Sequence, residues 1–134
     1  MGSEMCIRDR CTHLGMLPQS IHKIGCYRNF GNSEQEKHLL IKTATSLQNA
    51  GSELLILELV NSSTSKQITE VLKIPTVGIG SGKFVDGQVL VLYDILGIGD
   101  KLSFTKDFLS QSNSIEECVK SYIQAVKTGT FPEN

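Results

Sequence analysis

Glu58 is the residue of this chain best placed for acid–base chemistry, because it is the one charge in an apolar run, Leu54–Val60. A carboxylate in such a run is costly to bury unless a partner or a reaction uses it. Burial raises the pKa of a carboxyl group toward neutrality, which suits it to remove a proton from carbon next to a carbonyl. An ion pair, or a hydrogen bond to the loop of a neighbouring strand, explains the same pattern equally well.

Two further features could contribute to a site. His13 lies near the end of a short first strand, where a lone histidine is more often a hydrogen-bonded structural residue than a catalytic one. The glycine-rich stretch Gly78–Gly82 follows a strand, as an anion-binding turn would, but it lacks the spacing of the dinucleotide fingerprint and of the P-loop. Glycines in this pattern more often mark a tight strand exit where backbone approaches backbone.

The elements that must position these residues alternate along the chain. Ser33 with Glu36, and Ser114 with Glu117, have the spacing of capping boxes at helix starts. We expect strands near 11–15, 53–60, 76–80 and 88–93, helices following 33, 61–63 and 114, and one short helix near 105–109. Alternation of this kind predicts an α/β protein with parallel strands and right-handed crossover helices, either an open sheet or part of a barrel.

Chain length, net charge and the length of the apolar runs limit the classes of function that are possible. The chain has 134 residues and a net charge of -1, which suits one domain and gives no electrostatic case for nucleic acid or a membrane surface. It is shorter than a complete (β/α)8 barrel of about 250 residues. With short apolar runs and no secretory signal, we expect a cytoplasmic protein.

Neither the cysteines nor the first ten residues indicate a functional site. The four cysteines form no C-x-x-C pair, and the spacings of cysteine and histidine near the start fit no usual zinc pattern, so we expect no metal site from them. Residues 1–10 show no periodicity, and we interpret them as a non-native leader.

The ordered motifs of the remaining chain resemble the ketopantoate hydroxymethyltransferase family. HLGMLPQS resembles the family's H-L-G-L-T-P-Q-S, and IPTVGIGSG resembles I-P-x-I-G-I-G-A-G. GCYRNFG is similar to G-G-Y-K-V-Q-G, LILE to L-V-L-E, DGQVLVL to D-G-Q-I-L-V and GTFP to G-x-F-P. The chain departs from the family pattern at Thr12, at Leu59–Asn61 and at Tyr93.

The resemblance implies a fold and an activity. Residues 11–134 would be the carboxyl-terminal half of a TIM (β/α)8 barrel, corresponding to strands 5 to 8 and the C-terminal helix. The family transfers a hydroxymethyl group from 5,10-methylenetetrahydrofolate to 3-methyl-2-oxobutanoate, giving 2-dehydropantoate in pantothenate biosynthesis. Glu58 would be the proton acceptor at the end of the sixth strand, and His13 would line the active site.

The resemblance also implies a metal ion, and it places the ligands of that ion outside this chain. A Mg²⁺ ion chelates the oxo-acid substrate, and its ligands belong to the amino-terminal half of the barrel, so we expect this fragment to be inactive alone. The full-length protein would be a homo-oligomer. A non-catalytic binding module, or another Mg²⁺-dependent oxo-acid barrel enzyme, are the alternatives.

Overall fold

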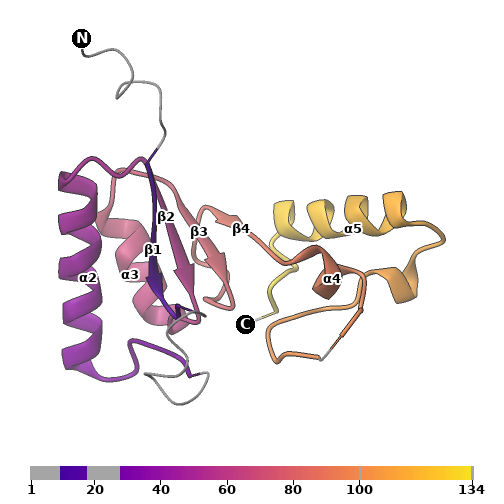
Figure 1. Ribbon diagram of the computed structural model, residues 1–134, viewed down its shortest axis with the longest axis horizontal. Coiled ribbons are helices and arrows are strands. Elements are labelled where there is room, and N and C mark those ends of the chain that lie inside the picture. Colours follow the sequence, from indigo (N-terminus) through magenta and orange to yellow (C-terminus); the bar gives the residue numbers. More distant parts are fainter. Residues whose placement is uncertain (1–9, 18–27, 100, 134) are drawn as a thin grey trace, which may run out of the picture.

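The computed structural model describes residues 10–17, 28–99 and 101–133. Its sheet has four parallel strands in the order β1-β2-β3-β4, and helices connect β1 to β2 and β2 to β3, which confirms the α/β class. Figure 1 shows the sheet with α2 and α3 beside it and with α4 and α5 further along the chain. The elements are β1 (Cys11–Gly15), α2 (Glu34–Asn49), β2 (Leu54–Glu58), α3 (Ser62–Val71), β3 (Thr76–Ile79), β4 (Gly87–Gln88), α4 (Leu92–Ile95), the 3₁₀ turn η3 (Leu109–Gln111) and α5 (Ile115–Lys127).

Side chains at the helix starts satisfy backbone amides that have no partner within the helix. The Ser33 hydroxyl accepts from the Glu36 amide at 3.2 Å, and the Glu36 carboxylate accepts from the Gly31 amide at 2.9 Å. At α5 the Ser114 hydroxyl accepts from the Glu117 amide at 3.1 Å. Both capping pairs are therefore confirmed as helix starts. In α2 the Glu36 carboxylate accepts from the Gly31 amide, whereas in a standard capping box it would accept from the amide of the cap residue, Ser33.

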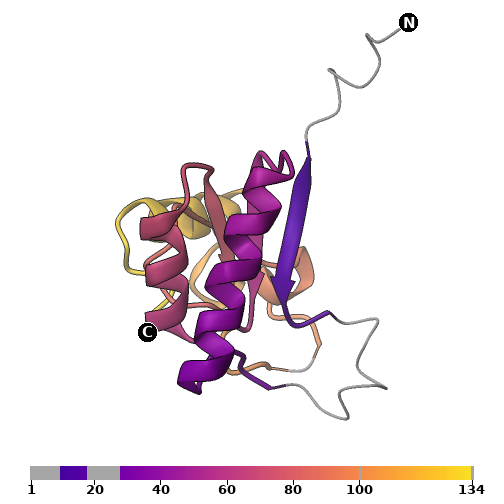
Figure 2. The same cartoon turned by 90° about the vertical axis from the view of Figure 1, so that its left-hand side faces the viewer.

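The core of the sheet region lies between the strands and the two long helices. Leu55 and Leu57 of β2 are fully buried and pack with Ala44 of α2 and Ile68 of α3. Figure 2 shows α2 and α3 side by side in front of one face of the sheet. Because side chains alternate along a strand, the other face of β2 carries Glu58 and the half-buried Ile56.

The fourth strand is shorter than the sequence indicated. We expected a strand over 88–93, but β4 is Gly87–Gln88, and α4 begins at Leu92. The reason is that β3 ends at Ile79 and the chain turns at Gly80 with φ of 62°, so the ladder ends with the bond from the Val89 amide to the Gly78 carbonyl. Of the apolar run beyond it, Leu90 is buried, whereas Val89, Val91, Leu92 and Tyr93 are exposed.

The C-terminal region forms a second cluster around aromatic rings. Phe108, Tyr122 and Phe131 make three edge-to-face contacts, with ring centroids 5.5 to 5.8 Å apart. Leu90 is buried in this cluster, which explains part of the apolar run after β4. The short helix expected near 105–109 is instead the 3₁₀ turn η3, which starts at Leu109.

Residue 10, where the described chain begins, is hydrogen-bonded to the strand beside β1. The Arg10 carbonyl accepts from the Glu53 amide at 2.8 Å, so residue 10 continues the edge of the sheet at β1. Residues 1–9 lie outside the described residues, and the leader stays a prediction. Within the described chain, no helix has the length and apolar character needed to span a bilayer.

Candidate functional site

Glu58 is the last residue of β2 and lies at the carboxyl edge of the sheet. Parallel register pairs it with Gly15 of β1 on one side and with Ile79 of β3 on the other. Its side chain points away from α2 and α3, since Leu57, its neighbour in the strand, is buried against them. The side chain is 14% exposed, so the carboxylate is largely buried and still open to a small molecule.

His13 is the described side chain that contacts the Glu58 carboxylate. Its Nε2 lies 3.2 Å from Glu58 Oε2 and 2.9 Å from the Met16 carbonyl oxygen. A carbonyl oxygen can only accept, so Nε2 must carry a hydrogen, which it shares between the two oxygens. In the neutral ring this leaves Nδ1 as an acceptor. The two residues that the sequence singled out therefore meet across β1 and β2.

The surroundings of Glu58 favour a proton acceptor. Burial raises the pKa of the Glu58 carboxyl group above its usual value, and the nearby His13 opposes that rise. Burial dominates because, among the described residues, no lysine or arginine makes an ion pair with Glu58. A carboxyl group with a raised pKa is a stronger base once it is ionised. The hydrogen-bond interpretation of Glu58 also holds, since its carboxylate contacts the histidine of the neighbouring strand.

The backbone around Glu58 is held from both neighbouring strands. The Met16 amide donates to the Glu58 carbonyl at 2.8 Å, and the Leu59 amide donates to the Ile79 carbonyl at 2.9 Å. This approach requires glycine at position 15, where φ is 97° and a Cβ would overlap the Glu58 carbonyl oxygen. Leu59 itself adopts a φ of 50°, a left-handed conformation that costs a residue with a Cβ about 1–2 kcal/mol.

The glycine-rich stretch is a tightly packed strand exit. A Cβ at Gly80 would lie 2.9 Å from Leu59 Cδ2 and from Phe104 Cγ, and one at Gly82 would overlap the Ser62 side chain. This crowding supports the packing interpretation of Gly78–Gly82. Sequence reasoning missed the role of Ser81, whose buried hydroxyl bonds the end of β2; its one visible signal was a serine at the alanine position of the family pattern.

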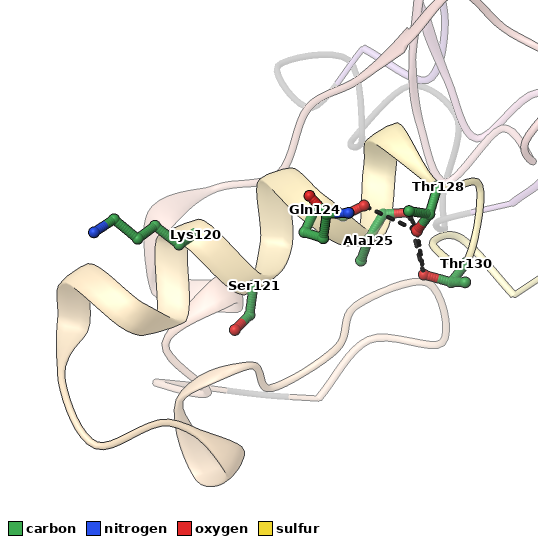
Figure 3. Close-up of a pocket in the computed structure, with 6 residues that line it drawn as sticks. All are labelled: Lys120, Ser121, Gln124, Ala125, Thr128 and Thr130. Atoms are coloured by element: carbon green, nitrogen blue, oxygen red, sulfur yellow. Dashed lines mark hydrogen bonds between the residues drawn. The ribbon is translucent and has the colours of Figure 1, made fainter.

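A surface hollow lies far along the chain from Glu58, on α5 and the segment after it. Figure 3 shows the six residues that line it, with the Thr128 and Thr130 hydroxyls 3.1 Å apart. Both hydroxyls also donate to the Ala125 carbonyl, at 3.3 Å each. The hollow therefore has satisfied polar groups and no acid–base pair.

The described residues contain no cluster of metal-ligating side chains. Among them, no three histidine, cysteine, aspartate or glutamate side chains gather as ligands would. Cys6, His22 and Cys26 lie outside the described residues. The described residues therefore do not supply a ligand set for Mg²⁺.

The fold and this site define a class of protein: a parallel α/β protein with a buried acidic group at the carboxyl edge of its sheet, where such folds place their chemistry. Residues 9–134 match the model of the ketopantoate hydroxymethyltransferase family. The chain belongs to this family of transferases.

Individual relatives agree with the family match. The 3-methyl-2-oxobutanoate hydroxymethyltransferase of Nitrosospira multiformis is 47% identical over 124 residues, which cover 91% of this chain and 47% of the relative. The 3-methyl-2-oxobutanoate hydroxymethyltransferase 2 of Hahella chejuensis is 45% identical over the same shares of the two chains. The chain thus spans about half the length of the curated relatives it matches, and its parallel sheet with alternating helices is consistent with part of a barrel.

Proposed function

We propose that this chain contributes the general base of a 3-methyl-2-oxobutanoate hydroxymethyltransferase, and that the base is Glu58. The whole protein would transfer a hydroxymethyl group from 5,10-methylenetetrahydrofolate to 3-methyl-2-oxobutanoate, giving 2-dehydropantoate for pantothenate synthesis. The observation that carries the proposal is a carboxylate that is only 14% exposed, with a raised pKa, at the carboxyl edge of a parallel sheet.

The chemistry follows from the acidity of carbon beside a carbonyl group. The ionised Glu58 carboxylate removes the proton from C3 of the oxo acid, and the electron pair left behind forms the enolate. That enolate then attacks the one-carbon unit through C3, forming the new carbon–carbon bond. The two bonds from the methylene carbon to the folate nitrogens break, and water supplies the hydroxyl group. The proton taken from C3 and the second proton of that water end on the two nitrogens, so tetrahydrofolate leaves. Proton removal by a positioned side chain contributes about 10²–10⁴-fold to a rate.

His13 acts on the carboxylate rather than on the substrate in this proposal. Its Nε2–H donates toward Glu58 Oε2 and is fixed by the Met16 carbonyl. This hydrogen bond orients one carboxylate oxygen, so the other is directed toward the substrate. His13 is therefore a positioning residue that lines the site.

The resemblance implies Mg²⁺ and a folate co-substrate for the whole protein, and both stay predictions. Described residues supply no metal ligand set, so what they contribute in this proposal is the base and its positioning groups. The cytoplasmic location, the absence of nucleic-acid and membrane partners, the homo-oligomer of the full-length protein and the inactivity of the fragment alone also stay predictions.

The experiment follows proton exchange at C3 of 3-methyl-2-oxobutanoate by NMR in deuterated water, using a full-length form that contains this chain. We expect Glu58→Gln to keep substrate binding and to lower the exchange rate by about 10²-fold or more. Glu70→Gln is the control, since Glu70 is an exposed α3 residue whose partner is Lys66. Exchange at the unmodified rate in Glu58→Gln would remove Glu58 as the base.

The binding-module alternative makes a different prediction for the same assay. A module that retained only the scaffold would bind the oxo acid without exchanging its C3 proton, even with Glu58 in place. Another oxo-acid barrel enzyme would exchange a proton on a different substrate. Comparing several 2-oxo acids in the unmodified protein therefore separates the three functions.

A further inference from the structure

Ser81 connects the glycine-rich exit of β3 to the end of β2. Its side chain is fully buried, its hydroxyl donates to the Leu57 carbonyl at 2.7 Å, and its oxygen accepts from the Val60 amide at 3.0 Å. The two bonded groups flank Glu58 and Leu59 in the sequence. One hydroxyl therefore ties together both ends of the short segment that presents the carboxylate.

The Val60 amide depends on this hydroxyl for geometric reasons. The β2–β3 ladder ends with the bond from the Leu59 amide to the Ile79 carbonyl, after which β3 turns away at Gly80. Val60 is buried, with 1% of its surface exposed, so water does not readily replace the missing strand partner. A buried amide without an acceptor is costly, and Ser81 supplies that acceptor.

The two bonds of this hydroxyl span Leu59, which has a left-handed conformation. Leu59 has a φ of 50°, which leucine adopts only where its surroundings impose it. The turn at Leu59 directs the Val60 amide toward Ser81 and fixes the direction in which Glu58 leaves the strand. Backbone strain held by specific contacts is found at functional sites, because it fixes a geometry that the chain would otherwise relax.

We propose that Ser81 is a positioning residue for the Glu58 carboxylate: its hydroxyl clamps the Leu57 carbonyl to the Val60 amide, and so holds Glu58 against His13 and toward the substrate. The positioning role of Ser81 rests on the proposed function of Glu58. The two hydrogen bonds of its hydroxyl do not depend on that function. Ser81 is buried and does not contact substrate, so it acts through the backbone of β2.

The test compares Ser81→Ala with Ser65→Ala. Alanine stands at this position in the family pattern, so Ser81→Ala is expected to fold. Ser65 is the matched control, because it is also fully buried and its hydroxyl also bonds Val60. That hydroxyl donates to the Val60 carbonyl oxygen at 3.4 Å. Both variants lose one buried hydroxyl beside the same residue, but only the first removes the acceptor for the Val60 amide.

Two measurements on the chain itself do not depend on activity. We expect Ser81→Ala to speed hydrogen exchange of the Val60 amide by about tenfold or more, as a buried amide loses its acceptor. We also expect the ¹⁵N resonance of His13 Nε2 to shift, because the contact with Glu58 loosens. Ser65→Ala should change neither signal, and unchanged signals in Ser81→Ala would overturn the clamp.

The third measurement is C3 proton exchange in the full-length form. We expect Ser81→Ala to lower the rate at saturating substrate by up to about tenfold, since misplacing a reacting group by about 1 Å costs up to a hundredfold and the family pattern tolerates alanine at this position. The half-saturating substrate concentration should stay unchanged, because Ser81 does not touch substrate. A normal maximal rate in Ser81→Ala, beside active unmodified protein, would overturn the positioning role. If the unmodified protein does not exchange the proton, the proposed function fails, and the His13 and Val60 signals still decide the clamp.

Discussion

The sheet region and the C-terminal region of this protein are built in different ways. In the sheet region, parallel backbone ladders fix the strands, and aliphatic side chains such as Leu55 and Leu57 pack against two helices. In the C-terminal region, three aromatic rings hold a short helix and a long one around a small cluster. The first arrangement fixes where strand ends meet, and the second fixes only how side chains fill a core.

This difference explains why the candidate site lies in one region and not in the other. Burial raises the pKa of Tyr122 and of the Cys118 thiol in the C-terminal region, as it does that of Glu58. The Tyr122 hydroxyl, however, donates to the Gln88 carbonyl at 3.0 Å, and the Cys118 thiol to the Ile95 carbonyl at 3.5 Å. These two polar atoms are bonded to backbone, and the charge of Asp107 adds to the rise in the pKa of Cys118. The Glu58 carboxylate is instead contacted by a side chain, the ring of His13.

The largest expected effect comes from removing one ring of the aromatic cluster. Phe108 is 6% exposed and contacts both Tyr122 and Phe131, so Phe108→Ala should cost about 3–5 kcal/mol. We expect the C-terminal region to unfold at lower urea concentration, while the His13 and Glu58 signals of the sheet region persist. Residue-resolved NMR across a urea series measures this. Simultaneous loss of both sets of signals would show that the two regions form one cooperative unit.

A pair of glycine variants compares the two regions at matched backbone conformation. Gly15 of the sheet region and Gly129 after α5 both have positive φ, at 97° and 69°. Gly129→Ala should cost about 1–2 kcal/mol for conformation alone, because no atom lies within 4 Å of the added Cβ. Gly15→Ala should cost about 1–3 kcal/mol more, since its Cβ overlaps the Glu58 carbonyl. Chemical denaturation of both variants tests this, and equal losses would contradict the close approach at Glu58.

The pH dependence of stability should separate Glu58 from surface carboxylates. The folded chain has a raised pKa at Glu58, so over the interval above the ordinary value it binds more protons than the unfolded chain. The free energy of unfolding therefore falls as pH rises from the unfolded pKa through the folded pKa. Glu58→Gln should remove this fall, while the exposed Glu70→Gln should retain it. Urea midpoints measured between about pH 4 and pH 8 give the comparison, and identical slopes would contradict the burial of Glu58.

The smallest effect is expected on the surface of α5. Lys120 is 71% exposed and pairs with Glu116 one turn earlier, beside the hollow that its helix lines. Exposed pairs of this spacing contribute about 0.5 kcal/mol or less, so Lys120→Ala should leave thermal unfolding nearly unchanged. A large loss of stability would show that this face of α5 is covered in the folded protein.

The sequence predicted helix starts well and one strand poorly. The pairs Ser33 with Glu36 and Ser114 with Glu117 act over three residues, so the local sequence contains the whole interaction. The strand predicted over 88–93 is wrong beyond Gln88, because a short run of apolar residues does not by itself distinguish a strand from other structure. Only Leu90 of that run is buried in the C-terminal cluster. Whether such a run pairs depends on the length of the neighbouring strand, which is set elsewhere in the chain.

By itself, the sequence determined the family through ordered motifs, and it singled out Glu58 as a charge that an apolar strand must bury. Only the tertiary structure decided what holds that residue: His13 from β1 contacts its carboxylate, the Met16 amide bonds its backbone carbonyl, and the Ser81 hydroxyl bonds the backbone on either side of it. The physical reason is that pairing of parallel strands brings together residues far apart in the chain, and which side chains then face one another depends on all the strands at once.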